Sequence, residues 1–137
     1  LKAHRLVLDK RLPRQNEAEV MNIIGQVEGR NVLLVDDMID TGGTFANAVK
    51  ALVKSGAETV YGACTHPVFS GQAPIKIQES GVRQILVTDT IPLSKDMEET
   101  GLVSVQSVAG LFAEAIKRTH LHQSISSLFD IDKDKLM

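Results

Sequence analysis

The sequence predicts an α/β fold in which a mostly parallel sheet is flanked by helices. Short apolar runs typical of buried strands alternate with segments whose apolar residues recur at helical spacing. With 137 residues, 43% of them hydrophobic, the chain is long enough for a domain with its own core. Because strands joined by helical crossovers lie parallel to one another, this alternation favours a parallel sheet.

Two short strands separated by a loop are predicted near the N-terminus. Residues 5–8 and residues 19–24 contain apolar runs long enough for short strands, and Gly25 ends the second. Residues 10–18 between them are polar and basic and include Pro13, so we expect a mobile loop there.

A turn, a buried strand and an amphipathic helix follow. Glu28 and Gly29 form the predicted turn, and the apolar run at residues 31–35 forms the strand. Residues 44–55 are predicted to be helical because their larger apolar residues recur at helical spacing, and Gly56 is a suitable residue to end the helix. The apolar residues at that spacing are Phe45, Val49 and Leu52.

Two further strands and a helix are predicted in the middle of the chain. Residues 59–64 have strand character, and we expect residues 65–67, which end in proline, to form a loop. Residues 72–80 form a predicted helix that Gly81 closes, and residues 84–88 form another apolar strand.

The C-terminal part contains a loop, a strand and a helix. Residues 89–101 are polar and are predicted to be a loop, whereas residues 102–106 form a short strand. Residues 108–122 are predicted to be helical because apolar residues and one arginine form a stripe along one face. That stripe consists of Leu111, Ala115 and Arg118.

A motif of acids, threonines and glycines joins the strand at residues 31–35 to the helix at residues 44–55. In parallel sheets, ligands bind beyond the C-terminal ends of the strands, which is where this motif is expected to lie. A helix start carries unpaired N–H groups and partial positive charge, and glycine lets the backbone approach an anion closely. The motif consists of Asp36, Asp37, Asp40, Thr41, Gly42, Gly43 and Thr44.

These residue types together predict a sugar-phosphate site. Asp36 and Asp37 can accept hydrogen bonds from a vicinal diol, directly or through bound Mg²⁺, while the glycines and threonines bind a phosphate. Asp40 suits a place beside a phosphate only if it shapes the loop or bonds a hydroxyl group. The alternative interpretation is an acidic strand-to-helix turn in which a threonine caps the helix.

Composition excludes several classes of function. The net charge of −2 argues against bulk electrostatic binding of nucleic acid, and we expect no nucleic-acid partner. No apolar stretch reaches the roughly 18 residues that span a bilayer, so we expect no membrane association. The single cysteine, Cys64, cannot form an intrachain disulfide and is expected to be a buried strand residue. It fits a reducing compartment, and we expect a cytoplasmic protein.

Five segments of the chain resemble known enzyme families. Residues 36–44 resemble the ribose-5-phosphate signature of type I phosphoribosyltransferase folds. The other four segments resemble, in the same order, parts of the ribose-phosphate pyrophosphokinase (phosphoribosyl-pyrophosphate synthetase) family, and the resemblance covers about residues 6–129. These four are residues 9–22, 64–71, 87–92 and 123–129.

The resemblance implies transfer of the β,γ-pyrophosphoryl group of ATP to the anomeric hydroxyl of ribose 5-phosphate, with Mg²⁺ as cofactor. It implies that Asp36 and Asp37 hold the ribose hydroxyls and that residues 40–44 cradle the 5-phosphate. It further implies that Lys10, on a flexible loop, is catalytic and stabilises charge on the transferred phosphates. A mobile cation that closes over the site agrees with the positioning and charge neutralisation that such transfers need.

The resemblance also implies an assembly and a regulatory site. Members of this family form dimers and hexamers, so we expect a homo-oligomer. Ser124, Ser126 and Phe129 would take the places of residues near an allosteric phosphate and ADP site at the subunit interface. The alternative is that the C-terminal segment simply packs Leu128 and Phe129 on the core.

Two departures from the family pattern limit the expected activity. Leu12 stands where the family has an arginine that follows the lysine, and leucine cannot make a bidentate phosphate contact. The resemblance reaches only the second of two similar domains, here residues 1–129 followed by a tail at residues 130–137. The absent first domain carries most ATP-binding residues, so we expect the isolated chain to bind ribose 5-phosphate weakly without turnover.

Two other functions remain open. A phosphoribosyltransferase would share residues 36–44, but it would normally need an upstream pyrophosphate loop and a hood over the base. A non-catalytic, synthetase-like regulatory subunit is the second alternative, and Leu12 is the feature that keeps it open.

His66 either lines the nucleotide side of the site or packs against Pro67.

Overall fold

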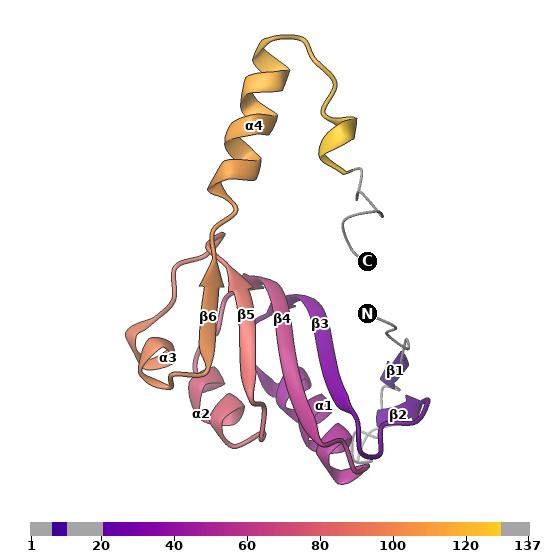
Figure 1. Ribbon diagram of the computed structural model, residues 1–137. Coiled ribbons are helices and arrows are strands. Elements are labelled where there is room, and N and C mark those ends of the chain that lie inside the picture. The colour runs from indigo at the N-terminus through magenta and orange to yellow at the C-terminus, as the bar shows by residue number, and fades with distance from the viewer. Residues whose placement is uncertain (1–6, 11–20, 130–137) are drawn as a thin grey trace. The chain divides into compact units, whose positions relative to one another are not determined.

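The computed structural model describes residues 7–10 and 21–129, and it divides into two units that we treat separately (Figure 1). We call the described residues up to Gln106 the sheet unit, and we call residues 107–129 the C-terminal unit. The strands are β1 (Val7–Lys10), β2 (Met21–Ile24), β3 (Asn31–Ile39), β4 (Thr59–Pro67), β5 (Gln84–Thr88) and β6 (Val103–Gln106). The helices are α1 (Gly43–Lys54), α2 (Ala73–Gln78), α3 (Lys95–Glu99), α4 (Ala109–His120) and the 3₁₀ helix η1 (Ser126–Leu128).

The main sheet is parallel, which confirms the predicted α/β class. Its four strands lie side by side in the order β3-β4-β5-β6, as Figure 1 shows. Each crossover between neighbouring strands contains a helix, namely α1, α2 or α3. This arrangement follows from the alternation of strand and helix patterns in the sequence, because parallel neighbours need a crossover connection.

A separate two-stranded sheet forms near the N-terminus. Strands β1 and β2 pair antiparallel, from Val7 opposite Ile24 to Lys10 opposite Met21. Strands were predicted in both places, and Lys10, which was assigned to the loop, is instead the last residue of β1. The rest of the predicted flexible loop, including Leu12, lies outside the described residues.

The core of the sheet unit lies between one face of the main sheet and its three helices. Val49 and Leu52 of α1, Ile77 of α2 and Met97 of α3 are fully buried in one cluster with Val60 and other inward residues of the strands. A side chain at Gly62 would collide with Phe45, because an added Cβ would lie 2.6 Å from the phenyl Cζ. Glycine at this position therefore lets α1 pack closely on β4.

The opposite face of the main sheet is apolar and exposed. Leu33, Val35 and Leu86 are 62%, 68% and 50% exposed, and Tyr61 lies on the same face. Parallel sheets are normally buried on both faces. We call these four residues the exposed sheet face.

Two predicted strand ends were wrong, and both for the same reason. Strand β3 continues to Ile39 rather than ending at residue 35, and β4 continues through the predicted loop to Pro67. The two extensions pair with each other, with Met38 opposite His66. The sequence did not predict these extensions because both contain polar residues, and a strand is predicted from the alternation of apolar residues.

The predicted loop at residues 89–101 was also wrong in part, since it contains helix α3. Ser94 is the N-cap of α3, and its hydroxyl accepts the N–H of Met97 at 3.3 Å. Met97 is fully buried and is the one apolar residue of this short helix. A single apolar residue has no periodicity, so the sequence pattern did not reveal the helix.

The remaining predicted elements are confirmed, with ends that differ by a few residues. Strand β5 has the predicted bounds, and α1, α2, β6 and α4 lie within or beside their predicted ranges. Gly56 and Gly81 have φ angles of +87° and +88° after α1 and α2, as helix-ending glycines should. Cys64 is buried in β4, as expected.

The C-terminal unit contains α4 and the short helix η1. The Arg118 guanidinium donates to Glu114 at 2.8 Å within α4 and also to the hydroxyl of Ser127. The arginine therefore ties the segment after α4 back to that helix and lowers the pKa of Glu114 by hydrogen bonding. None of the helices in the described parts of the chain has the length and apolar character that spanning a bilayer requires.

Leucine-to-alanine substitutions on the two sides of the main sheet should lower the free energy of unfolding by different amounts. Leu52→Ala is expected to lower the free energy of unfolding by about 2–5 kcal/mol, because it leaves a cavity in the core. Leu33→Ala on the exposed sheet face should cost less than about 1 kcal/mol. Urea denaturation of the two variants checks this, and equal losses would show that Leu33 is buried in solution.

Candidate functional site

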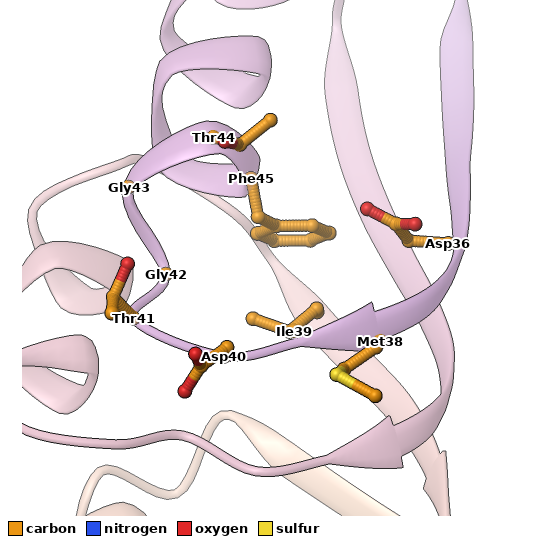
Figure 2. Close-up of a pocket in the computed structure, with 9 residues that line it drawn as sticks. All are labelled: Asp36, Met38, Ile39, Asp40, Thr41, Gly42, Gly43, Thr44 and Phe45. Atoms are coloured by element: carbon orange, nitrogen blue, oxygen red, sulfur yellow. The ribbon is translucent and has the colours of Figure 1, made fainter.

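The candidate site is a pocket where β3 passes into α1 (Figure 2). Its volume is about 210 Å³, and it lies at the C-terminal end of a parallel strand, where α/β folds bind ligands. Six of the seven motif residues singled out in the sequence line it. The nine lining residues are Asp36, Met38, Ile39, Asp40, Thr41, Gly42, Gly43, Thr44 and Phe45.

The loop between β3 and α1 depends on Gly42. This residue has a φ of +72°, and an added Cβ would lie 3.3 Å from Ala73 of α2, so both the backbone and the space favour glycine. Gly42 is also the N-cap of α1, and its carbonyl accepts the N–H of Ala46 at 2.9 Å. The alternative of a threonine cap is therefore wrong for this helix, since glycine has no side chain to bond the first-turn amides.

The start of α1 is suited to an anion. The first amides of a helix have no partner within the helix itself, and they carry partial positive charge. Thr41 and Thr44 supply hydroxyl groups beside this helix start (Figure 2). The combination is a general means of binding phosphate or carboxylate groups through backbone N–H donors.

The paired acids lie inside β3, and not after its end as the sequence suggested. Asp36 is half-buried and lines the pocket, and Figure 2 shows its carboxylate on the side of the strand that faces Phe45. Asp37 is exposed and is not among the lining residues. The two carboxylates nevertheless lie close enough to interact, because, in addition to burial, hydrogen bonding and charge repulsion between the side chains of Asp36 and Asp37 both raise the pKa of Asp36.

Asp36 differs electrostatically from an ordinary surface acid. Partial burial raises the pKa of its carboxyl group, and the neighbouring Asp37 carboxylate also raises it, while backbone N–H groups oppose the rise. One of these is the N–H of Asp37, which donates to the Asp36 carboxylate at 2.9 Å. A carboxylate in this position gains from a ligand that supplies hydrogen-bond donors or a cation.

Two residues that the sequence did not indicate contact the loop. The hydroxyl of Ser70 donates to the Asp40 carboxylate at 2.6 Å, and the ammonium of Lys76 donates to the carbonyl of Thr41 at 3.3 Å. They are separated from their partners by 30 and 35 residues. No local sequence pattern could have found them, because only the parallel pairing of β3 with β4 brings these segments together.

A polar cluster lies at the same edge of the sheet, where β4 and β5 end. His66 Nδ1 lies 3.0 Å from the hydroxyl of Thr90, and Thr88 donates to the carbonyl of Thr65 at 2.6 Å. The predicted loop at His66 is wrong, since this residue belongs to β4, whereas its packing against Pro67 and its place on the nucleotide side both stay predictions. Burial raises the pKa of the Cys64 thiol, which therefore stays protonated at neutral pH and has a structural role.

The other predicted site residues are not placed in the pocket. Lys10 ends β1, but its side chain lies outside the described residues. Ser124, Ser126 and Phe129 belong to the C-terminal unit, where Phe129 is 75% exposed. Their regulatory role stays a prediction. Within the described residues, no group of three or more His, Cys, Asp and Glu side chains could hold a metal ion.

Comparison with known proteins gives a family match over almost the whole chain. The model of a family described as the phosphoribosyl synthetase-associated domain matches residues 4–130. A ribose-phosphate pyrophosphokinase of Vibrio vulnificus strain YJ016 is 51% identical over 124 residues, which are 90% of this chain and 40% of that protein. One of Oceanobacillus iheyensis is 48% identical over 130 residues, which are 95% of this chain and 41% of that protein.

A solved structure agrees with the fold. The crystal structure of phosphoribosylpyrophosphate synthetase from Mycobacterium smegmatis superposes with a TM-score of 0.71 and 40% sequence identity. The match covers 75% of this chain and 34% of that one. The chain therefore spans about two fifths of the length of the curated relatives that it matches.

The raised pKa of Asp36 predicts a pH-dependent effect of Asp36→Asn. The folded state holds the proton more tightly than the unfolded chain, so ionisation of Asp36 removes stability as the pH rises through its folded pKa. The variant cannot ionise, so its stability relative to the wild type should be more favourable at about pH 7 than at about pH 3.

Urea denaturation at both pH values measures this difference. Glu58→Gln, an equal change of charge at an exposed position, shows how much of it arises from net charge alone. If Asp36→Asn and Glu58→Gln change the free energy of unfolding by the same amount at each pH, the pKa of Asp36 is not raised.

Proposed function

Because the chain belongs to the phosphoribosyl synthetase-associated domain family, we propose that it is the ribose-5-phosphate-binding part of a ribose-phosphate pyrophosphokinase. The observation that carries this proposal is the pocket at the end of β3, where a half-buried acid lies beside a helix start that has no side-chain cap. A sugar phosphate presents hydroxyl donors and a charged phosphate, which are the two kinds of group that this pocket accommodates.

The proposed roles follow the chemistry of the residues. Asp36 and Asp37 bind the ribose hydroxyls, and residues 40–44 cradle the 5-phosphate with backbone N–H groups and threonine hydroxyls. Lys10 reaches the transferred phosphates as the catalytic cation. The reaction is transfer of pyrophosphate from ATP to C1 of ribose 5-phosphate, which depends chiefly on positioning and charge neutralisation.

The proposed cofactor is Mg²⁺, and the donor set fits it. Magnesium is bound by one or two carboxylates together with substrate oxygens and waters, so a cage of several protein ligands is not needed. Asp36 and Asp37 supply the hard oxygen donors. The ion, when bound, would neutralise charge on the phosphates that are transferred.

The rest of the proposed activity requires more than this chain. The relatives are about two and a half times as long as the part matched here, and we propose that ATP binds largely to the region outside it. The proposed parent is a cytoplasmic homo-oligomer, and the isolated chain should bind ribose 5-phosphate without turning over.

A non-catalytic, synthetase-like subunit is the second candidate, and Leu12 favours it. A leucine cannot replace an arginine that makes a bidentate phosphate contact. The phosphoribosyltransferase alternative has no such observation in its favour, because the relatives and the solved structure are named as synthetases or pyrophosphokinases.

The first prediction of this proposal concerns ligand binding. In a calorimetric titration with Mg²⁺, the chain should bind ribose 5-phosphate, and Thr41→Ala should weaken binding by about tenfold or more, since it removes a hydrogen bond to a charged group. Thr59→Ala, at the opposite end of β4, is the matched control and should bind normally. Tight binding of phosphoribosyl pyrophosphate with no affinity for ribose 5-phosphate would favour the transferase instead.

The second prediction separates the catalytic from the non-catalytic candidate. If the parent is a competent pyrophosphokinase, Leu12→Arg in the full-length protein should change its activity by less than about tenfold. A gain of about a hundredfold or more would identify the natural protein as a degenerate, binding-only subunit. The assay follows formation of phosphoribosyl pyrophosphate from ATP and ribose 5-phosphate.

A further inference from the structure

We infer that Ser70 and Lys76 are positioning residues that adapt the loop between β3 and α1 to a doubly charged phosphate. Ser70 holds the carboxylate of Asp40, and Lys76 places a positive charge against the loop backbone. The inference rests on the proposed function, because it concerns the group that the loop is proposed to bind.

The pocket presents a charge problem that these residues solve. Among the nine described residues that line it, Asp36 and Asp40 are carboxylic acids and none is basic. A phosphate dianion is repelled by carboxylates at short range, especially where protein replaces water. The helix start supplies only a partial positive charge, so a site for phosphate needs further compensation near the loop.

Ser70 engages Asp40 through both its side chain and its backbone. Its hydroxyl donates to the carboxylate at 2.6 Å, and its N–H donates to the carbonyl of Asp40 at 3.0 Å. In Figure 2 the Asp40 carboxylate points away from the side chains of Ile39 and Phe45. The two bonds fix the acid in this orientation, and the short hydroxyl bond directs its charged oxygen toward Ser70.

The backbone around Ser70 is shaped for this contact. Phe69, the residue before it, is buried with a φ of +46°, a left-handed conformation that is unusual for a bulky side chain. Its N–H donates to the carbonyl of Ile39 at 3.0 Å, which continues the alignment of this segment with the loop. A strained backbone of this kind persists only where the surrounding structure holds it in place. The conformation of Phe69 thereby sets the position of the next residue, Ser70.

Lys76 approaches the loop from α2. Its ammonium lies 3.3 Å from the carbonyl oxygen of Thr41, and the side chain is half-buried. An ammonium has three donors, so a bond to one carbonyl leaves capacity for an anion bound at the same loop. The contact thus stabilises the loop conformation and adds the full positive charge that the lining residues lack.

A double substitution separates charge control from simple bracing of the loop. Ser70→Ala should weaken ribose 5-phosphate binding by about tenfold, because it frees the charged Asp40 carboxylate to turn toward the phosphate. Adding Asp40→Asn should restore affinity to within about threefold of the wild type, since a neutral amide does not repel phosphate. If Ser70 only braces the loop, the second substitution will not restore binding, and that result would overturn its assigned role.

Lys76 is tested by the dependence of binding on salt. Lys76→Met should weaken ribose 5-phosphate binding by about tenfold and reduce its sensitivity to ionic strength, because one charge pair is removed. Lys54→Met at the end of α1 is the matched control for Lys76→Met. Ser104→Ala, which loses a 2.7 Å hydrogen bond from Gln84, is the matched control for Ser70→Ala. Both controls should bind normally. Unchanged affinity and salt dependence in Lys76→Met would exclude its role.

Inorganic phosphate, titrated in parallel with the same variants, distinguishes failure of this inference from failure of the proposed function. Wild-type binding of phosphate without binding of ribose 5-phosphate would refute the proposed substrate, and the variants would still decide the roles of Ser70 and Lys76. A wild-type chain that binds neither anion would overturn the inference, because the loop would then not be a phosphate site.

Discussion

The parallel pairing of β3 with β4 is the constraint on which the rest of the site depends. It extends both strands past their predicted ends and aligns Ile39 with Pro67 at one edge of the sheet. This alignment brings the chain after β4 alongside the loop after β3, where Phe69 and Ser70 bond the backbone of Ile39 and Asp40. The lining residues of the pocket belong to β3, the following loop and the start of α1, and the segment after β4 holds that loop by hydrogen bonds.

Close packing on the covered face makes that pairing stable. Gly62 leaves room for the buried side chains of Phe45 and Ile85, so the first turn of α1 can pack closely on the sheet. The N-terminus of α1 consequently has a fixed position relative to Asp36. A helix start and an acid on separate elements can serve one ligand only if the distance between them is fixed.

The charges of the site balance in an unusual way. Both charged residues in the described pocket lining are acids, yet the start of α1 suits an anion. The ligand that resolves this conflict carries hydroxyl donors at one end and negative charge at the other, as a sugar phosphate does. In the proposed complex, Asp36 faces the hydroxyl end, Ser70 holds Asp40 in place, and the phosphate end meets backbone N–H groups and Lys76.

Local patterns in the sequence determined the elements and the chemical character of the motif. The alternation of apolar runs and helical periods predicted the parallel sheet, and the glycines and threonines after β3 predicted a phosphate-suited loop. Helix α3 was missed because one buried methionine has no period, and the strand ends were missed because their pairing residues are polar. Only the tertiary structure decided that Asp36 lines the pocket whereas Asp37 does not, and that Ser70 and Lys76 reach the loop. These contacts join residues some 30 positions apart, and such contacts arise from strand pairing and crossover packing, which no local pattern specifies.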